Sequence, residues 1–189
     1  MVNEHRVQWH KYSIQGFCVR FLPFYLLFTL TLFASPKDLS SFNSKFIQTI
    51  IDDNNKKIVY YGELWASKPQ NALWVYQKPI QKSVYINAQQ ITVVEPQIEQ
   101  VTLRKLGDEI DFLAIVKKAK PIDANRYSAT VNAQTYIVEF KNDLLTSISY
   151  KDGFDNQVSI RFTDPLQNRP IESSRFKALI PSDYDVIKD

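Results

Sequence analysis

A β-hairpin is the structure that the stretch GELWASKPQNALWVY, residues 62–76, most clearly predicts. Its first part alternates small or apolar residues with larger or polar ones, the period-two pattern of a strand that has two different faces. Residues 68–71 hold a proline and an asparagine, which favour a turn, and the strand pattern resumes at residues 73–76. Trp65 and Trp74 add more aromatic surface than a thin sheet exposes, so another part of the chain must cover it.

The chain after residue 35 continues as short strands that are separated by turn residues rather than by helices. This succession predicts a mainly β fold with a single antiparallel sheet. A sheet of about eleven strands does not stay flat and open, so we expect it to curl into an incomplete, half-open barrel. The predicted strands are residues 42–50, 56–67, 73–77, 83–86, 91–95, 99–103, 127–132, 135–140, 145–151, 158–164 and 174–179.

One segment, residues 108–118, has the periodicity of a helix instead. Ile110, Leu113 and Ala114 recur at positions i, i+3 and i+4, which places them on one face. Lysines at the end of the segment suit a helix C-terminus, and Pro121 stops the pattern. The sequence therefore predicts a short amphipathic helix, or two shorter ones, between the two halves of the sheet.

Residues 1–35 differ in kind from the rest and predict a cleaved secretory signal peptide. Three basic residues precede an apolar run at residues 21–33, and a small residue follows at Ala34. A retained membrane anchor is the alternative, because the basic lead is long and Leu32 is large for a residue before a cleavage site. The run is shorter than the roughly 20 residues that span a bilayer, which favours cleavage. We therefore expect one domain, residues 36–189, with a sizeable core.

Removal of the leader changes the charge and the chemistry available. The leader holds three of the 23 Lys and Arg residues and one of the 20 Asp and Glu residues, so residues 36–189 carry a net charge of about +1. A charge this small gives no indication of nucleic acid as a partner. His5, His10 and Cys18 also leave, so we expect no Ser-His-Asp triad, thiol nucleophile, imidazole or thiolate metal site, or cofactor. Carboxylates beside turns, such as Asp52 and Asp53, remain candidates for acid-base chemistry or calcium, although a solvated turn is the reading that we prefer.

Four stretches share an order and spacing with a known family. They are SFNSKFIQTI at residues 41–50, the G-x-L-W strand with Lys68-Pro69 and the hydrophobic-Trp strand after it, PIQKSVYINAQQITVVEP at residues 79–96, and FKALIPSDYDVI at residues 176–187. Together they resemble the family of periplasmic outer-membrane lipoprotein carriers (LolA). The chain departs from the family at Lys68, where arginine is usual.

The resemblance implies a half-open barrel closed by a short helical lid, with acyl chains held between the two. By hydrogen bonding to the lid, the arginine before the proline stabilises the closed form in the family, so Lys68 and Pro69 are the expected lid latch. Lysine lacks the planar fork of arginine, and a solvent-exposed turn charge explains Lys68 equally well. The residues expected to line the cavity, which without the resemblance would read as core, are Phe46, Leu64, Trp65, Trp74, Tyr76, Phe112, Leu113 and Ile115.

The resemblance further implies a monomeric periplasmic chaperone that is not an enzyme. It would accept acylated lipoproteins from the inner-membrane lipoprotein-releasing ABC transporter and deliver them to the outer-membrane lipoprotein acceptor. That acceptor is itself a lipoprotein of similar fold, but Cys18 lies before the apolar run and is not placed for acylation. Two alternatives stay open: a periplasmic signalling or scaffold domain of the same fold that binds a protein or lipid ligand without transporting it, and a lipid-processing enzyme that uses carboxylates.

Overall fold

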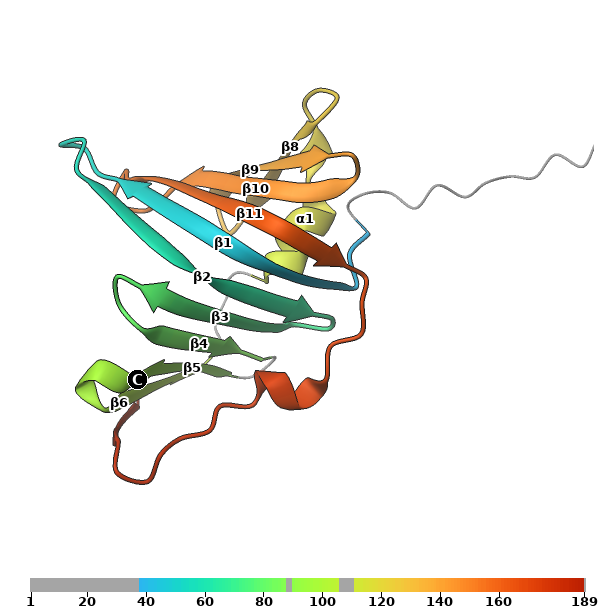
Figure 1. The fold of residues 1–189 in the computed structure, drawn as a ribbon. Coiled ribbons are helices and arrows are strands. Elements are labelled where there is room, and N and C mark those ends of the chain that lie inside the picture. Colours follow the sequence, from blue (N-terminus) through green and yellow to red (C-terminus); the bar gives the residue numbers. More distant parts are fainter. Residues whose placement is uncertain (1–37, 88–89, 106–110, 189) are drawn as a thin grey trace, which may run out of the picture. The chain divides into compact units, whose positions relative to one another are not determined.

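The computed structural model describes residues 38–87, 90–105 and 111–188, which form a single open, curled sheet with one short α-helix (Figure 1). The predicted leader, residues 1–35, lies outside the described residues, as does the start of the predicted helix. Within the described part of the chain, no helix is long and apolar enough to cross a membrane. The strands are β1 (Ser41–Ile51), β2 (Lys57–Ser67), β3 (Asn71–Lys78), β4 (Lys82–Ile86), β5 (Gln90–Glu95), β6 (Gln100–Lys105), β7 (Lys120–Pro121), β8 (Arg126–Val131), β9 (Gln134–Lys141), β10 (Leu144–Lys151), β11 (Gln157–Gln167) and β12 (Asp185–Lys188); the helices are α1 (Phe112–Lys118) and the 3-10 helices η1 (Pro96–Ile98) and η2 (Ser173–Phe176).

The strand order β12-β6-β5-β4-β3-β2-β1-β11-β10-β9-β8-β7 makes one sheet from two meanders. Strand β1 joins them, because it pairs antiparallel with β2 on one side and with β11 on the other. The mainly β architecture is therefore confirmed, with twelve described strands where the sequence predicted about eleven. The helix is also confirmed, beginning at Phe112 after an N-cap at Asp111, whose carboxylate accepts hydrogen bonds from the backbone N–H groups of Leu113 and Ala114 at 2.9 and 3.2 Å.

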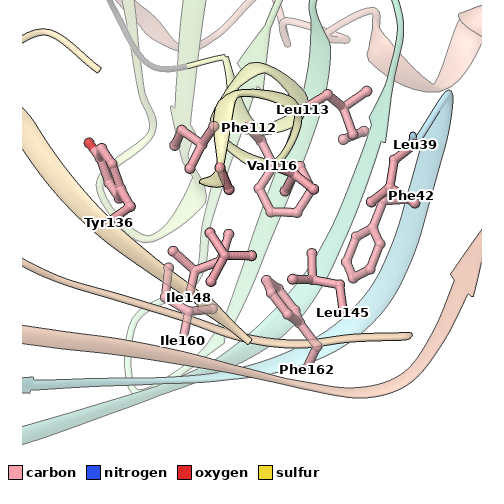
Figure 2. Packing of buried hydrophobic residues seen from close by; sticks show 14 of the residues in the cluster. Leu39, Phe42, Phe112, Leu113, Val116, Tyr136, Leu145, Ile148, Ile160 and Phe162 are labelled. Carbon is pink, nitrogen blue, oxygen red and sulfur yellow. The ribbon is translucent and has the colours of Figure 1, made fainter. Parts of the chain in front are cut away.

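The core lies between α1 and one face of the sheet, which we call the inner face. Phe42 and Phe46, four positions apart on β1, point to the same face of that strand and are almost fully buried there. Figure 2 shows Phe112 and Val116 of α1 facing residues of the sheet, with Leu113 to one side near Leu39. The Phe42 ring centroid lies 5.2 Å from that of Phe112 and 4.9 Å from that of Phe162. This packing fixes the helix against the sheet at its N-terminal end.

Gly62 makes room for the core at the centre of the sheet. A Cβ atom at this position would lie 2.7 Å from Cζ of Phe46 and would overlap the backbone carbonyl oxygen of Val75. Any other residue would therefore force β2 away from β3 or expel the Phe46 ring. The absence of a side chain at Gly62 lets the large Phe46 ring lie over the inner face.

The C-terminal region differs from the prediction. Residues 174–179 do not form a strand: they include the end of η2, in which Phe176 is buried, and they continue as irregular chain to the exposed Leu179. The last strand is β12 instead, and it pairs with β6 in parallel. Because β11 lies in the middle of the sheet and β12 at its edge, the connection must cross the strands between them, and Figure 1 shows it passing beside β3 and β4.

Candidate functional site

A cavity of about 340 Å³ lies between α1 and the inner face of the sheet. Its volume falls at the lower end of the roughly 300–1,000 Å³ that ligand pockets usually have. Its lining is aliphatic and aromatic with a few uncharged polar groups, and none of the described residues that line it is charged. Such a cavity favours an uncharged, largely apolar ligand, because burying a charge there without a partner would cost several kcal/mol.

The strand period places the lining residues. Side chains two positions apart point to the same face of a strand, so several strands contribute a neighbouring pair. These pairs are Trp74 and Tyr76 on β3, Val84 and Ile86 on β4, and Ile148 and Tyr150 on β10. Phe112 and Ile115 of α1 close the opposite side. The cavity is therefore bounded by strands from both meanders and by a single short helix.

Four of the residues expected at the cavity do line it: Trp74, Tyr76, Phe112 and Ile115. Phe46 lies beneath them, with its ring centroid 5.2 Å from those of both Trp74 and Tyr76. Leu64 is fully buried in the same core cluster. These two residues thus support the cavity from below and do not contribute to its lining.

Leu113 lies on another side of α1. It lines a surface groove together with Asp111, Lys68 and Pro69, the last two being the residues expected to form a latch. The Lys68 Nζ atom lies 3.6 Å from Oδ1 of Asp38, and both side chains are substantially exposed, so this ion pair is weak. The turn that carries Lys68 is therefore next to α1, although the ion pair of Lys68 is with the segment before β1.

Trp65 is placed on the opposite face of the sheet, which corrects the expectation that it lines the cavity. Its neighbour Leu64 points into the core, and adjacent residues of a strand point to opposite faces. The Arg175 guanidinium carbon lies 4.8 Å from the centroid of the Trp65 ring, a cation-π contact with the C-terminal connection. The aromatic surface of Trp65 is thus covered from outside the sheet.

Three polar lining residues were not expected from the sequence: Gln48, Tyr136 and Tyr150. The Tyr136 side chain is only 1% exposed, and its hydroxyl is buried without a hydrogen-bond partner among the described residues. Burial raises the pKa of Tyr136 to about 12, and the nearby Tyr150 adds to this shift. Burial also raises the pKa of Tyr76, and the nearby Tyr150 and Tyr60 add to this shift. The pKa of Tyr150 is raised by burial as well. All three hydroxyls are therefore protonated donors at neutral pH.

The signal for these residues lies in the alternation of the strands. Tyr136, Val138 and Phe140 share one face of β9, and all three are buried. Gln48 shares a face of β1 with Phe46 in the same way. Among the described residues, no group of three or more His, Cys, Asp and Glu side chains is arranged to hold a metal ion.

Comparisons with known proteins identify relatives of this chain. Residues 37–116 match the family model described as outer membrane lipoprotein carrier protein LolA. The outer-membrane lipoprotein carrier protein of Campylobacter jejuni is 37% identical over 164 residues, which cover 87% of this chain and 96% of that protein. The protein of the same name from Helicobacter pylori is 38% identical over 138 residues, or 73% of this chain and 74% of that protein.

A solved structure supports the fold alone. The crystal structure of an uncharacterized conserved protein from Thermus thermophilus superposes with a TM-score of 0.52. The superposition covers 81% of this chain and 93% of that chain, at a sequence identity of 8%. At this identity the likeness concerns the arrangement of the sheet and helix and not the chemistry of the cavity.

Proposed function

Because this chain belongs to the LolA family of outer-membrane lipoprotein carrier proteins, we propose that it carries lipoproteins by enclosing their acyl chains in the cavity between α1 and the inner face. The observation that supports this site is the uncharged, mostly apolar lining closed by one short helix. Acyl chains are bound there by the area they remove from water, about 25 cal/mol per Å² or roughly 0.8 kcal/mol per methylene. Because this free energy depends on the buried area alone, the cavity is expected to discriminate little between acyl chains of similar size.

Loading requires α1 to move, and the contacts of the empty form oppose that movement. Phe112, Leu113, Ile115 and Val116 of α1 are all buried in the core cluster. Their burial stabilises the closed, empty form, so the observed affinity for a ligand is the intrinsic affinity reduced by the fraction of open protein. A carrier needs this reduction, because it must release its cargo as well as bind it.

We propose Lys68 and Pro69 as the latch of this lid. Support comes from the groove that they line along one side of α1, which extends from Asp111 to Lys118. Lysine presents three donors without the planar fork of arginine, so it holds the helix with less geometric specificity. The latch in this chain then contributes less to closure than the aromatic contacts of Phe112.

The cellular context follows as part of the same proposal. Residues 1–35 direct export and are removed, and residues 36–189 act as a monomer in the periplasm. The inner-membrane lipoprotein-releasing ABC transporter supplies acylated lipoproteins, and an outer-membrane acceptor receives them. The protein sequesters and transfers its cargo without making or breaking a covalent bond, and therefore without a cofactor.

Fluorescence of Trp74 tests the proposed site. A variant with Trp9→Phe and Trp65→Phe retains Trp74 as its only indole, at the cavity wall. We expect a saturable change in its emission on titration with a triacylated lipopeptide, and none with the same peptide without acyl chains. A folded protein whose Trp74 emission is unaffected by both peptides would refute acyl binding in this cavity and favour a scaffold domain of the same fold.

A further inference from the structure

The polar lining residues gather toward one end of the cavity. On β1, Phe42 pairs with Ala66 near the Lys68 turn, whereas Gln48 pairs with Tyr60, close to the opposite turn at residues 52–56. Tyr136 and Tyr150 are directly paired residues of β9 and β10, with ring centroids 5.1 Å apart. Tyr150 lies next to the turn that begins at Asp152. The polar end of the cavity therefore faces the strand ends, and the end lined by Phe112, which packs on the core residue Phe42, is apolar.

Tyr76 belongs to this group as well. Its ring packs edge-on against Tyr60 at 5.7 Å, and Tyr150 is close enough to contribute to the raised pKa of both Tyr76 and Tyr136. Three protonated hydroxyls from strands of both meanders thus lie around one part of the cavity, with the amide of Gln48 on the strand between them. We call Gln48, Tyr76, Tyr136 and Tyr150 the polar rim.

The Tyr136 hydroxyl, which has no hydrogen-bond partner in the part of the chain that the structure describes, is the observation that points to a ligand. Burial of a hydroxyl without a hydrogen-bond partner is unfavourable, and a phenylalanine would fill the same space without that cost. A ligand that presents an acceptor oxygen beside it would remove the cost on binding. Hydroxyls and an amide also offer donors to such an oxygen without a charge that the cavity would have to desolvate.

We propose that the polar rim hydrogen bonds to the carbonyl oxygens of ester- or amide-linked acyl chains. This inference rests on the proposed function and adds to it the polar group that the site recognises. In an acyl group the carbonyl oxygen is the acceptor, and it stands at the head of the chain. With the carbonyl at the polar rim, the hydrocarbon extends toward Phe112 and Phe42, and the polypeptide of the cargo leaves past the strand ends.

A pair of ligands that differ only in the carbonyl oxygens tests this proposal. The probes are a peptide that carries S-[2,3-bis(octanoyloxy)propyl]cysteine and the same peptide with the bis(octyloxy) ether. Both have the same number of carbon atoms in each chain, and the short chains keep them dispersed in water during isothermal titration calorimetry. We expect the protein to bind the ester about three- to tenfold more tightly than the ether, as one net hydrogen bond would give.

The Tyr136→Phe variant connects the preference to the polar rim. It is expected to melt at the same temperature as the original protein or higher, and to lose most of the ester preference, measured as the ratio of its affinities for the ester and the ether. Tyr85→Phe is the matched control, because Tyr85 lines a groove on the opposite face of the sheet. The Tyr85→Phe protein should keep the full preference for the ester over the ether.

Equal affinity for ester and ether in the original protein would overturn the role of the polar rim and leave the acyl-binding site standing. An ester preference that survives the triple change Tyr76→Phe, Tyr136→Phe and Tyr150→Phe would overturn it too. Failure to bind either ligand would instead refute the proposed function itself, so the two failures are distinguishable.

Discussion

Replacement of Ile86 by glutamate is expected to weaken binding of an acylated peptide by at least about a hundredfold. Ile86 lines the cavity on β4 and packs partly buried against the core, where it pairs with Ala72 of β3. In the empty protein a carboxylate at this position still reaches water, whereas a bound acyl chain would strip that water away. Desolvation of an unpaired charge costs several kcal/mol, and each 1.4 kcal/mol is about a factor of ten in affinity. Calorimetry with the ester probe measures the loss.

Ile47→Glu is the control for this change. Ile47 is also partly buried on a strand, but it faces the other side of the sheet and pairs with Arg161 of β11. The same substitution there should leave the affinity within about twofold of the original. Equal losses in both variants would mean that the charge acts through stability, and undiminished binding by Ile86→Glu would place the acyl chains elsewhere.

Phe112→Ala is expected to have opposite effects on stability and on affinity. The Phe112 ring centroid lies 5.2, 5.9 and 6.1 Å from those of Phe42, Phe162 and Trp74, so it joins α1 to three strands. Loss of this buried ring should lower the free energy of unfolding by about 3–5 kcal/mol. Because these contacts hold the lid shut, the open fraction rises, and we expect the affinity for an acylated peptide to increase about tenfold or more. Urea unfolding and calorimetry give the two quantities.

Phe176→Ala separates these effects. Phe176 is 4% exposed, close to the 5% of Phe112, but it belongs to η2 in the C-terminal connection. Its truncation should lower stability without any gain in affinity. A Phe112→Ala protein that is destabilised and binds more weakly would show that the ring serves the ligand more than the lid, and the proposed role of α1 would then be wrong.

Most of the fold follows from local patterns in the sequence. Alternation identifies the long strands β1, β2 and β11, and the apolar spacing with the lysines at its end identifies α1. The C-terminal region could not be predicted in this way, because residues 174–179 alternate as a strand would but pair with no sheet edge. The sheet edge is reached only at β12, whose parallel pairing with β6 joins residues far apart in the chain.

The candidate site was less accessible to sequence reasoning. The pattern around Trp65 shows that Trp65 and Leu64 face opposite sides, but it does not show which side is inward when both are apolar. The small Gly62 and Ala66, on the face of Leu64, are the physical indication, since they leave room for the Phe46 ring and the core. Tyr136 approaches the β1–β4 meander only because β1 pairs with β11, a contact between distant segments that no local pattern contains.

Transfer of a lipoprotein from detergent to this protein is the most direct test of the carrier role. A triacylated lipoprotein in detergent is mixed with the protein, the detergent is removed, and the mixture is separated by gel filtration. We predict that the lipoprotein stays in solution and elutes together with this chain, and that the same lipoprotein without its acyl chains elutes alone. Aggregation of the acylated lipoprotein in the presence of the folded protein, or co-elution that does not depend on acylation, would contradict the account.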